Sequence, residues 1–481
     1  MSSSETEWET VIGLEVHCEL ATATKLFCGC PNHFGDQPNT NVCPVCLGLP
    51  GSLPVLNEQA VELAIRLGRA LHSTVQRSVF ARKNYFYPDM PKDYQISQYD
   101  LPINAGGWID LPSGQRVGIT RAHLEEDTGK STHVRTDGSG GGRIHDAEYS
   151  LVDYNRSGVP LLEIVSEPDM RSADEAKAYA TELREVILAV AASDAKMEEG
   201  SMRVDANVSV RHPGDPFGTR CEIKNLNSIR SLGRAIEYEA RRQIDLIEAG
   251  EKVRQETRHW DDGAGRTSTL RTKEEAEDYR YFPEPDLVPL DPGDDWIARV
   301  DAALPALPAQ RRNRLAEVAG VEPTTGAVAI AVERALDGLA VAAIGEGADA
   351  GRVLTHVEHN LAVDGAVDLA PARLAALVRM ETGGELTATQ AKSVLAEMVA
   401  TGDAPAVIAK AKGFEAMGED ALAAVVDQVI ADNADDWQRY VDGDDKARGK
   451  LTGFFVGKVM KATKGQADGK AVTALLRQRV G

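Results

Sequence analysis

The sequence contains no run of about 18 consecutive apolar residues, the length that a membrane-spanning helix requires. Its beginning, Met-Ser-Ser-Ser-Glu-Thr-Glu, has neither the basic nor the apolar part of a targeting signal. Both absences predict a soluble cytoplasmic protein. Apolar residues make up 43% of the chain and charged residues 26%, as in globular proteins, and 481 residues are too many for one core. Two or three domains are therefore expected.

Basic residues are outnumbered, with 53 Lys and Arg against 74 Asp and Glu. The net charge of −21 would repel nucleic acid if it were spread evenly. However, residues 446–481 contain nine Lys or Arg and one acid, so this segment carries +8 and the preceding 445 residues carry −29. The alternative is a solvated lysine face, but the contrast favours RNA contact. The lysines expected on a phosphate backbone are Lys450, Lys458, Lys461, Lys464 and Lys470.

Cysteines are also few, six in all, and they do not resemble a disulfide framework. Cys28-Gly-Cys30 and Cys43-Pro-Val-Cys46 form two knuckles that can place four thiolates around one zinc ion. Four cysteine ligands leave no open position for water, so the zinc would be structural, and the alternative is a group of buried free thiols. Cys18 and Cys221 fall on apolar faces of predicted strands and are expected in the core.

Two segments alternate between apolar and polar residues, as half-buried strands do. In Trp8–Leu20 the polar face carries Glu15 and His17, and in Ile119–Asp127 it carries Arg121, His123, Glu125 and Asp127. If both faces point the same way, Glu15, His17 and Glu125 come together with Glu126 or Asp127. Carboxylates with one imidazole suit Mg²⁺ or Mn²⁺ better than zinc. The alternative is an exposed acidic turn.

Two later segments repeat this alternation. Met197–Arg211 places Asp205 opposite a row of Val and Ala residues, and Arg220–Asn225 places Glu222 and Lys224 opposite Cys221 and Ile223. Four such strands predict an antiparallel sheet that packs on one side and forms a basin on the other, and hence an α+β fold.

Aromatic residues are only 5% of the chain, yet they gather in Arg82–Asp100 among Lys and Arg. Tyr85 and Tyr94 with Lys83 and Lys92 suit a nucleotide base or the end of an RNA strand. An aromatic mini-core under a loop is the alternative. The Gly-rich Ser131–Arg143 lacks the Lys-Ser/Thr of a P-loop and is weak evidence for phosphate binding.

The composition changes along the chain and predicts three domains. The Pro-rich Phe282–Pro292 is interpreted as a boundary. Beyond Asp294 the residues are mostly Ala, Leu, Val, Glu and Asp with helical spacing, and no catalytic constellation appears there. The predicted domains are 8–293, which contains the sheet and the cysteine knuckles, 294–402, which is helical, and 403–481, which is a small helical tail.

Long strings in fixed order make residues 1 to about 290 similar to the B subunit (GatB) of the aspartyl/glutamyl-tRNA amidotransferases. The remainder resembles the helical domain and YqeY-type tail of that family, through length and pattern more than through strings. The matching strings are Ile12–His17, Pro38–Thr40, Cys43–Gly51, Arg82–Asp89, Pro91–Asp100, His123–Asp127, Asp153–Val165, Met197–Ser201 and Tyr279–Asp286.

The resemblance implies a cradle domain related to glutamine synthetase, a helical linker domain and a tRNA-contacting tail. It also implies that ATP phosphorylates the side-chain carboxylate of Asp or Glu misattached to tRNA, and that ammonia then displaces phosphate. We expect Glu15, His17 and Glu125 to bind magnesium, with Glu126 and Glu222 as further candidates. Arg156, Lys83 and Lys92 would meet phosphate or the tRNA terminus. The remaining nucleotide or tRNA-end candidates are Tyr85, Tyr94, Arg121, Asp205 and Lys224.

The chain has no Ser-Ser-Lys amidase pattern in a Gly/Ser-rich setting, so ammonia must come from another subunit. In the family that is the amidase A subunit, and a small C subunit completes a heterotrimer. Two alternatives remain at this point. One is a zinc-stabilised tRNA-binding scaffold without catalysis, and the other is an ATP-dependent ligase that acts on a free small carboxylate.

Overall fold

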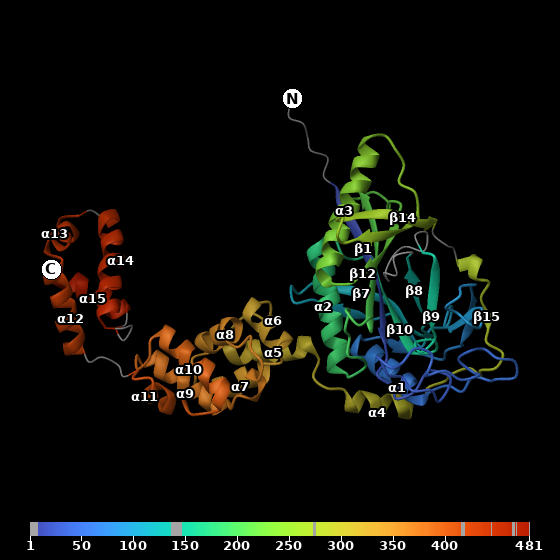
Figure 1. Ribbon diagram of the computed structural model, residues 1–481, viewed down its shortest axis with the longest axis horizontal. Coiled ribbons are helices and arrows are strands. Elements are labelled where there is room, and N and C mark those ends of the chain that lie inside the picture. Colours follow the sequence, from blue (N-terminus) through green and yellow to red (C-terminus); the bar gives the residue numbers. More distant parts are fainter. Residues whose placement is uncertain are drawn as a thin grey trace. The chain divides into compact units, whose positions relative to one another are not determined.

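The computed structural model describes residues 8–135, 147–272, 276–414, 419–443, 445–463, 467 and 469–480. The chain forms two compact units, Met1–Ala309 and Gln310–Gly481 (Figure 1). The Gly-rich segment in which phosphate binding was considered falls largely outside the described residues.

A ten-stranded sheet forms the centre of the first unit, in the order β14-β13-β12-β11-β1-β10-β7-β5-β2, with β6 paired to β7. Described neighbours in this sheet pair antiparallel, as predicted, except for the parallel pair β12 and β13. The strands are β1 (Glu9–Glu19), β2 (Thr74–Val75), β5 (Asn104–Ala105), β6 (Trp108–Asp110), β7 (Arg116–Glu126), β10 (Pro160–Ser166), β11 (Met202–Arg211), β12 (Cys221–Leu226), β13 (Glu256–Asp261) and β14 (Arg266–Thr272).

One face of this sheet is apolar and covered by helices. Leu14, Val16 and Leu124 are buried in its core, which confirms the alternation predicted for β1 and β7. The covering helices are α1 (Glu58–Ala70), α2 (Ala173–Ala189) and α3 (Ile229–Glu248), and α2 and α3 lie side by side (Figure 1). The charged side chains of the same strands therefore lie on the opposite face.

Local hydrogen bonds explain where these helices begin. The side chain of Asn57 accepts from the backbone N–H groups of Gln59 and Ala60 at the start of α1. The hydroxyls of Ser172 and Ser228 do the same for α2 and α3. Each cap satisfies backbone donors that have no partner inside the helix.

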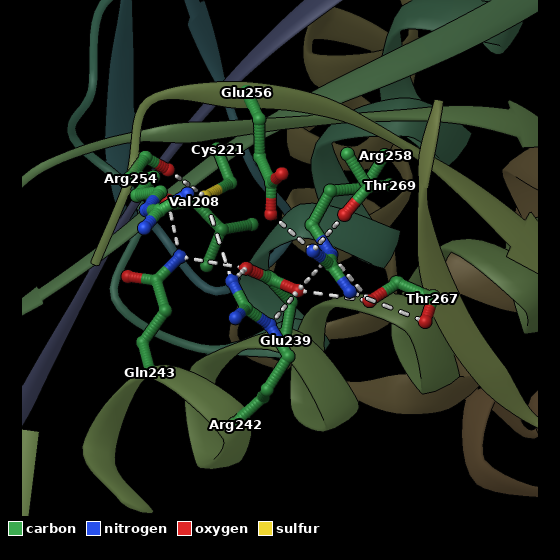
Figure 2. Close-up of polar contacts among 10 residues, drawn as sticks. All are labelled: Val208, Cys221, Glu239, Arg242, Gln243, Arg254, Glu256, Arg258, Thr267 and Thr269. Atoms are coloured by element: carbon green, nitrogen blue, oxygen red, sulfur yellow. Dashed lines mark hydrogen bonds and ion pairs between the residues drawn. The ribbon is translucent and has the colours of Figure 1, made fainter. Parts of the chain in front are cut away.

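A buried polar network fixes α3 to the sheet (Figure 2). The carboxylate of Glu239, which has 0% exposure, accepts from Arg242 at 2.6 Å, Gln243 at 2.9 Å and Thr267 at 3.0 Å. Arg258 Nε lies 3.2 Å from the same carboxylate. Because every charge has an opposite partner, the network is compatible with burial.

Two smaller sheets complete the strands of this unit. The first has the order β15-β3-β4, with β15 (Phe282–Pro283), β3 (Ala81–Asn84) and β4 (Tyr94–Ser97), and the second pairs β8 (Lys130–Val134) with β9 (Tyr149–Asp153). Ser78 and Leu290 exchange backbone hydrogen bonds at 2.8 and 2.9 Å, so the Pro-rich segment is attached to the first unit. The 3-10 helix η2 (Ala276–Tyr279) precedes this segment, and α4 (Asp294–Ala303) follows it and contacts α1.

The second unit is helical. One apolar core joins α5 to α11, and a separate core joins α12 to α15. Among the described residues, no helix is both long and apolar enough to span a bilayer. The helices are α5 (Pro308–Ala319), α6 (Gly326–Glu333), α7 (Asp337–Gly345), α8 (Ala350–His359), η3 (Ala366–Asp368), α9 (Pro371–Thr382), α10 (Ala388–Thr401), α11 (Pro405–Ala411), α12 (Glu419–Asp432), α13 (Ala434–Asp442), α14 (Asp445–Ala462) and α15 (Gly469–Val480).

Candidate active site

Three adjacent central strands bring the candidate residues together. In the sheet, β10 lies between β1 and β7, so Glu163 pairs with His17 on one side and with His123 on the other. Glu125 stands two residues further along β7 on the same face. This register assembles two imidazoles and two carboxylates from three segments that are far apart in the sequence.

We call His17, Glu125 and Glu163 the acid cluster, because one ligand atom of each lies within 4.8 Å of the others. His17 Nε2 is 3.4 Å from a Glu163 oxygen and 4.0 Å from a Glu125 oxygen. The side chains are only 18%, 11% and 4% exposed for His17, Glu163 and Glu125. A compact set of two carboxylates and one imidazole fits a hard divalent cation such as Mg²⁺ or Mn²⁺.

The acid cluster is charged although it is buried. Burial raises the pKa of Glu125 and Glu163, but hydrogen bonds and charges from His123, His17 and Lys83 outweigh this and hold both pKa values below their usual range. Burial lowers the pKa of His17, but Glu163, Asp205 and Glu125 raise it to about 9. The carboxylates are therefore ionised at neutral pH and available to a cation, which would displace the proton of His17 when it binds the imidazole.

Glu15 stands beside the acid cluster without joining it. Its carboxylate accepts from Asn207 at 2.9 Å, and its neighbour in the sheet register is Asp205. Burial raises the pKa of Glu15, and the charges of Glu163, Glu222 and Asp205 raise it further. The structure thus brings predicted His17 and Glu125 together with Glu163, which was not predicted. Glu15 as a metal ligand stays a prediction.

The predicted Asp205, Glu222 and Lys224 meet at the next strands of the same face. Lys224 Nζ lies 2.6 Å from Asp205 and 3.2 Å from Glu222. Thr257 of β13 donates to the other Glu222 oxygen at 2.8 Å. Burial lowers the pKa of Lys224, but Asp205 and Glu222 raise it above its usual range, so the ammonium persists.

Two arginines gather at the far end of these strands. Arg203 Nη2 lies 2.5 Å and Arg156 Nε 3.5 Å from Oδ2 of Asp127. Burial raises the pKa of Asp127, but the two guanidinium groups lower it to about 2. Burial and the charge of Asp127 raise the pKa of Glu19 to about 8. Arg156 was predicted to meet phosphate or the tRNA terminus, whereas Arg203 was not predicted as a site residue.

The aromatic and basic candidates divide into two groups. The charges of Glu125 and Glu163 raise the pKa of Lys83 although burial lowers it, so its ammonium persists. Burial raises the pKa of Tyr85, and Asp89 and Glu125 raise it further. Arg121 and Tyr281 are electrostatic neighbours, and Arg121 Nε is buried without a hydrogen-bond partner in the described structure.

Lys92, Tyr94 and Glu126 form the other group. Lys92 makes an ion pair with Glu126, which also accepts from the backbone N–H of Ile96 at 2.9 Å. The ammonium of Lys92 lies 5.4 Å from the centre of the Tyr94 ring. Glu126 therefore bonds to Lys92 rather than to the acid cluster, as expected for a residue directly after Glu125 in a strand.

The four predicted zinc cysteines also converge. The sulfur atoms of Cys28, Cys30, Cys43 and Cys46 all lie within 4.8 Å of one another. Hydrogen bonds from Cys28 and from the backbone of Cys43, and the charge of Lys25, lower the pKa of Cys46 to about 4 although burial raises it. Four sulfurs with one ready thiolate fit zinc, which binds thiolates tetrahedrally.

Comparison with known proteins adds the family to this geometry. Residues 10–298 match the model of the GatB/GatE catalytic domain, and residues 353–480 match that of the GatB domain. The chain belongs to the GatB family. Relatives named as the B subunit of aspartyl/glutamyl-tRNA(Asn/Gln) amidotransferase include those of Frankia casuarinae, 49% identical over 98% of this chain and 96% of the relative, and Moorella thermoacetica, 48% identical over 98% and 100%. The resemblance proposed from the sequence strings is confirmed.

The two family matches also contain the sites that the sequence predicts. The acid cluster and all four zinc cysteines fall within the GatB/GatE catalytic match. The GatB domain match contains the predicted basic tail, where Lys450, Lys458 and Lys461 of α14 are exposed. Lys464 lies outside the described residues, and so does the side chain of Lys470.

Sequence reasoning missed Glu163 because most of its neighbours in Pro160–Ser166 are apolar. The alternation of that segment places Glu163 opposite buried Leu162 and Ile164, on the polar face. A carboxylate at such a position is costly unless it is paired, and Glu163 is also part of the GatB-like string Asp153–Val165. Both signals were present in the sequence.

Proposed function

We propose that this chain is the B subunit of a tRNA-dependent amidotransferase and that it activates the side-chain carboxylate of Asp-tRNA(Asn), Glu-tRNA(Gln) or both. ATP transfers its γ-phosphoryl group to the carboxylate and leaves as ADP. Ammonia then attacks the acyl carbon, phosphate leaves, and one proton is lost to give the amide. The reaction needs activation because a carboxylate is a poor electrophile and phosphate is a good leaving group.

The observation that carries this proposal is the acid cluster on three adjacent strands. His17, Glu125 and Glu163 would hold the divalent ion, which would supply positive charge beside the phosphates of ATP. Two anions about 4 Å apart repel by about 4 kcal/mol at an intermediate dielectric constant. Lys83, Lys224 and Arg156 add fixed positive charge and would orient the phosphate and the tRNA terminus.

The remaining parts of the chain have supporting roles in this proposal. Residues 8–293 form the catalytic cradle, of the glutamine synthetase type, and residues 294–402 form a helical linker. Residues 403–481 form a tail whose lysines contact the tRNA backbone, and the four cysteines bind a structural zinc. Ammonia comes from an amidase A subunit, and a small C subunit completes the heterotrimer.

The test is reconstitution of the chain with its amidase and small partner subunits. Asp-tRNA(Asn) and Glu-tRNA(Gln) are supplied separately with glutamine, Mg²⁺ and ATP, and both ADP and amidated tRNA are measured. We expect ADP to form only with a misacylated tRNA, in proportion to the amide produced. ADP formation with a free small carboxylate and no tRNA, or glutamine hydrolysis by this chain alone, would contradict the proposed division of labour.

A further inference from the structure

Two of the GatB-like strings, Arg82–Asp89 and Tyr279–Asp286, meet in the structure. β15 pairs with β3, so Phe282 is opposite Arg82 and Pro283 is opposite Ala81. Arg82 donates to buried Glu284 at 2.7 and 2.8 Å, which fixes the end of the second string. We call residues 279–284 the strap.

The strap contains an unusual backbone conformation. Arg280 has φ +48°, in the left-handed region that L side chains rarely adopt. Such a residue persists only where its surroundings hold it. The holding group is the side-chain amide of Asn84, which donates to the backbone carbonyls of Tyr279 at 3.1 Å and Arg280 at 2.9 Å.

The turn at Arg280 determines where two aromatic rings lie. The Tyr281 ring stacks on Tyr99 with centroids 4.2 Å apart and 8° between planes. The Tyr279 ring lies 6.0 Å from the Tyr281 ring, and its centre is 4.9 Å from the ammonium of Lys83. The ammonium of Lys83 therefore lies against an aromatic face of the strap.

Neighbouring residues of β3 thus have different contacts. Arg82 and Asn84 hydrogen-bond to the strap, whereas the ammonium of Lys83 between them lies against the Tyr279 ring and its pKa is raised by the charges of Glu125 and Glu163. A change in the strap would therefore reach the acid cluster through Tyr279 and Lys83, without any contact between Asn84 and the reacting groups.

We propose that Asn84 is a positioning residue for the reaction: it holds the left-handed turn at Arg280 and thereby places Tyr279 under Lys83 beside the acid cluster. This inference rests on the proposed function, because it is tested through the rate of carboxylate activation and amidation. Asn84 acts through the strap and Lys83 and does not touch substrate.

The test uses the complex of the chain with its partner subunits. In Asn84→Ala, we expect kcat for amidation to fall at least tenfold while KM for misacylated tRNA changes less than threefold. Gln76→Ala is the matched control, because the Gln76 amide also donates to a backbone carbonyl, of Pro102 at 2.8 Å, and is half-buried in the same unit. Its kcat should stay within twofold of the unaltered complex.

The decisive readout is rescue at a second position. Glycine adopts positive φ at no steric cost, so Arg280→Gly no longer needs the hold of Asn84. The kcat of the double variant Asn84→Ala, Arg280→Gly should be at least fivefold higher than that of Asn84→Ala alone. A packing role of Asn84 would not explain this recovery, because the second change does not refill the space that the Asn84 side chain occupied. An aspartate at position 84 has the same shape as asparagine but no side-chain N–H to donate. If the alanine variant does not fold, Asn84→Asp is therefore compared with the double variant Asn84→Asp, Arg280→Gly.

Two results would overturn the inference. One is a kcat within twofold of the unaltered complex when Asn84 is replaced, and the other is a double variant no faster than the single variant. An inactive unaltered complex would instead contradict the proposed function, so the two failures are distinguishable.

Discussion

His356 of α8 is a buried histidine whose hydrogen bonds define its protonation state. The amide of Asn360 donates to Nδ1 at 3.0 Å, so Nδ1 accepts, and Nε2 lies 2.8 Å from a Glu381 oxygen and donates to it. Burial lowers the pKa of His356 and outweighs the opposing effect of Glu381. The neutral imidazole is therefore the form that the second unit accommodates.

This predicts a pH-dependent stability of α8 and α9. The pKa of His356 is lower in the folded state than in the unfolded state, so the unfolded state binds more protons at mildly acidic pH. The stabilisation is full above an unfolded pKa of about 6.5 and is lost as pH falls through the folded value, by at most about 1.4 kcal/mol per pH unit. Hydrogen exchange of α8 and α9 at pH 7.5 and 5.5 measures it.

His356→Gln should reduce this pH dependence, because the replacement does not titrate. His359→Gln, at a side chain that is 63% exposed, should leave it unchanged. If the stability of α8 and α9 changes equally with pH in the unaltered chain and in His356→Gln, the account is contradicted.

The residues of the acid cluster were predictable to different degrees. His17 and Glu125 could be found because each alternates with apolar neighbours over a long strand. Glu163 was hidden in a short strand whose polar-face neighbours, Leu161 and Val165, are apolar. Its role follows from its position between β1 and β7, and strand order is a property of the whole sheet rather than of one segment.

At the scale of elements, α3 is attached to the sheet through charge as well as apolar packing. Glu239 on the helix contacts Arg258 on β13, and Thr267 on β14 donates to the same carboxylate (Figure 2). On its other face, β13 donates through Thr257 to Glu222. The network therefore stabilises the strand that also supports the site.

We expect Glu239→Ala to destabilise the first unit by about 3–5 kcal/mol, because the guanidinium groups of buried Arg258 and half-buried Arg242 lose the carboxylate that they share. Glu237→Ala, at an exposed position of the same helix, should change stability by less than about 0.5 kcal/mol. Urea unfolding followed by the fluorescence of buried Trp260 measures both. Similar midpoints for the two variants would show that the network contributes little.

Long periodic elements were predicted well and short ones were not. The strands β1, β7 and β11 are recognisable from their alternation of apolar and polar residues. The parallel pairing of β12 with β13 was not expected, because pairing direction has no local pattern. The Pro-rich segment after Tyr281 was interpreted as a domain boundary from its composition alone. In the structure, Arg82 and Ser78, some 200 residues away in sequence, attach this segment to the first unit.

At the scale of the whole molecule, the unequal distribution of charge is the main feature. The chain carries −21 overall, but the exposed lysines of α14 belong to a segment of opposite sign. An acidic body with a basic tail would confine tRNA backbone contacts to that tail and to the positive groups of the site.

Replacing Lys450, Lys458 and Lys461 by Gln should reduce the salt dependence of tRNA binding. Removing one lysine–phosphate ion pair lowers the slope of log K against log salt by roughly 0.7 to 0.9. A reduction of about 2 to 3 is therefore expected for the triple variant. Lys252→Gln with Lys392→Gln, both exposed and outside the tail, is the control. An unchanged slope in the triple variant would remove the tail from the binding surface.

The central claim is that the acid cluster serves phosphoryl transfer to a tRNA-bound carboxylate. Its most direct test is the rate of tRNA-dependent ADP formation by the reconstituted complex after Glu125→Gln or Glu163→Gln. Glu167→Gln is the control, because Glu167 is exposed just beyond β10 and accepts from Thr120 at 2.7 Å. We predict at least a 100-fold loss for both cluster variants with tRNA affinity retained, and near-normal rates for the control. Full ADP formation without either carboxylate would contradict the account and favour a binding scaffold.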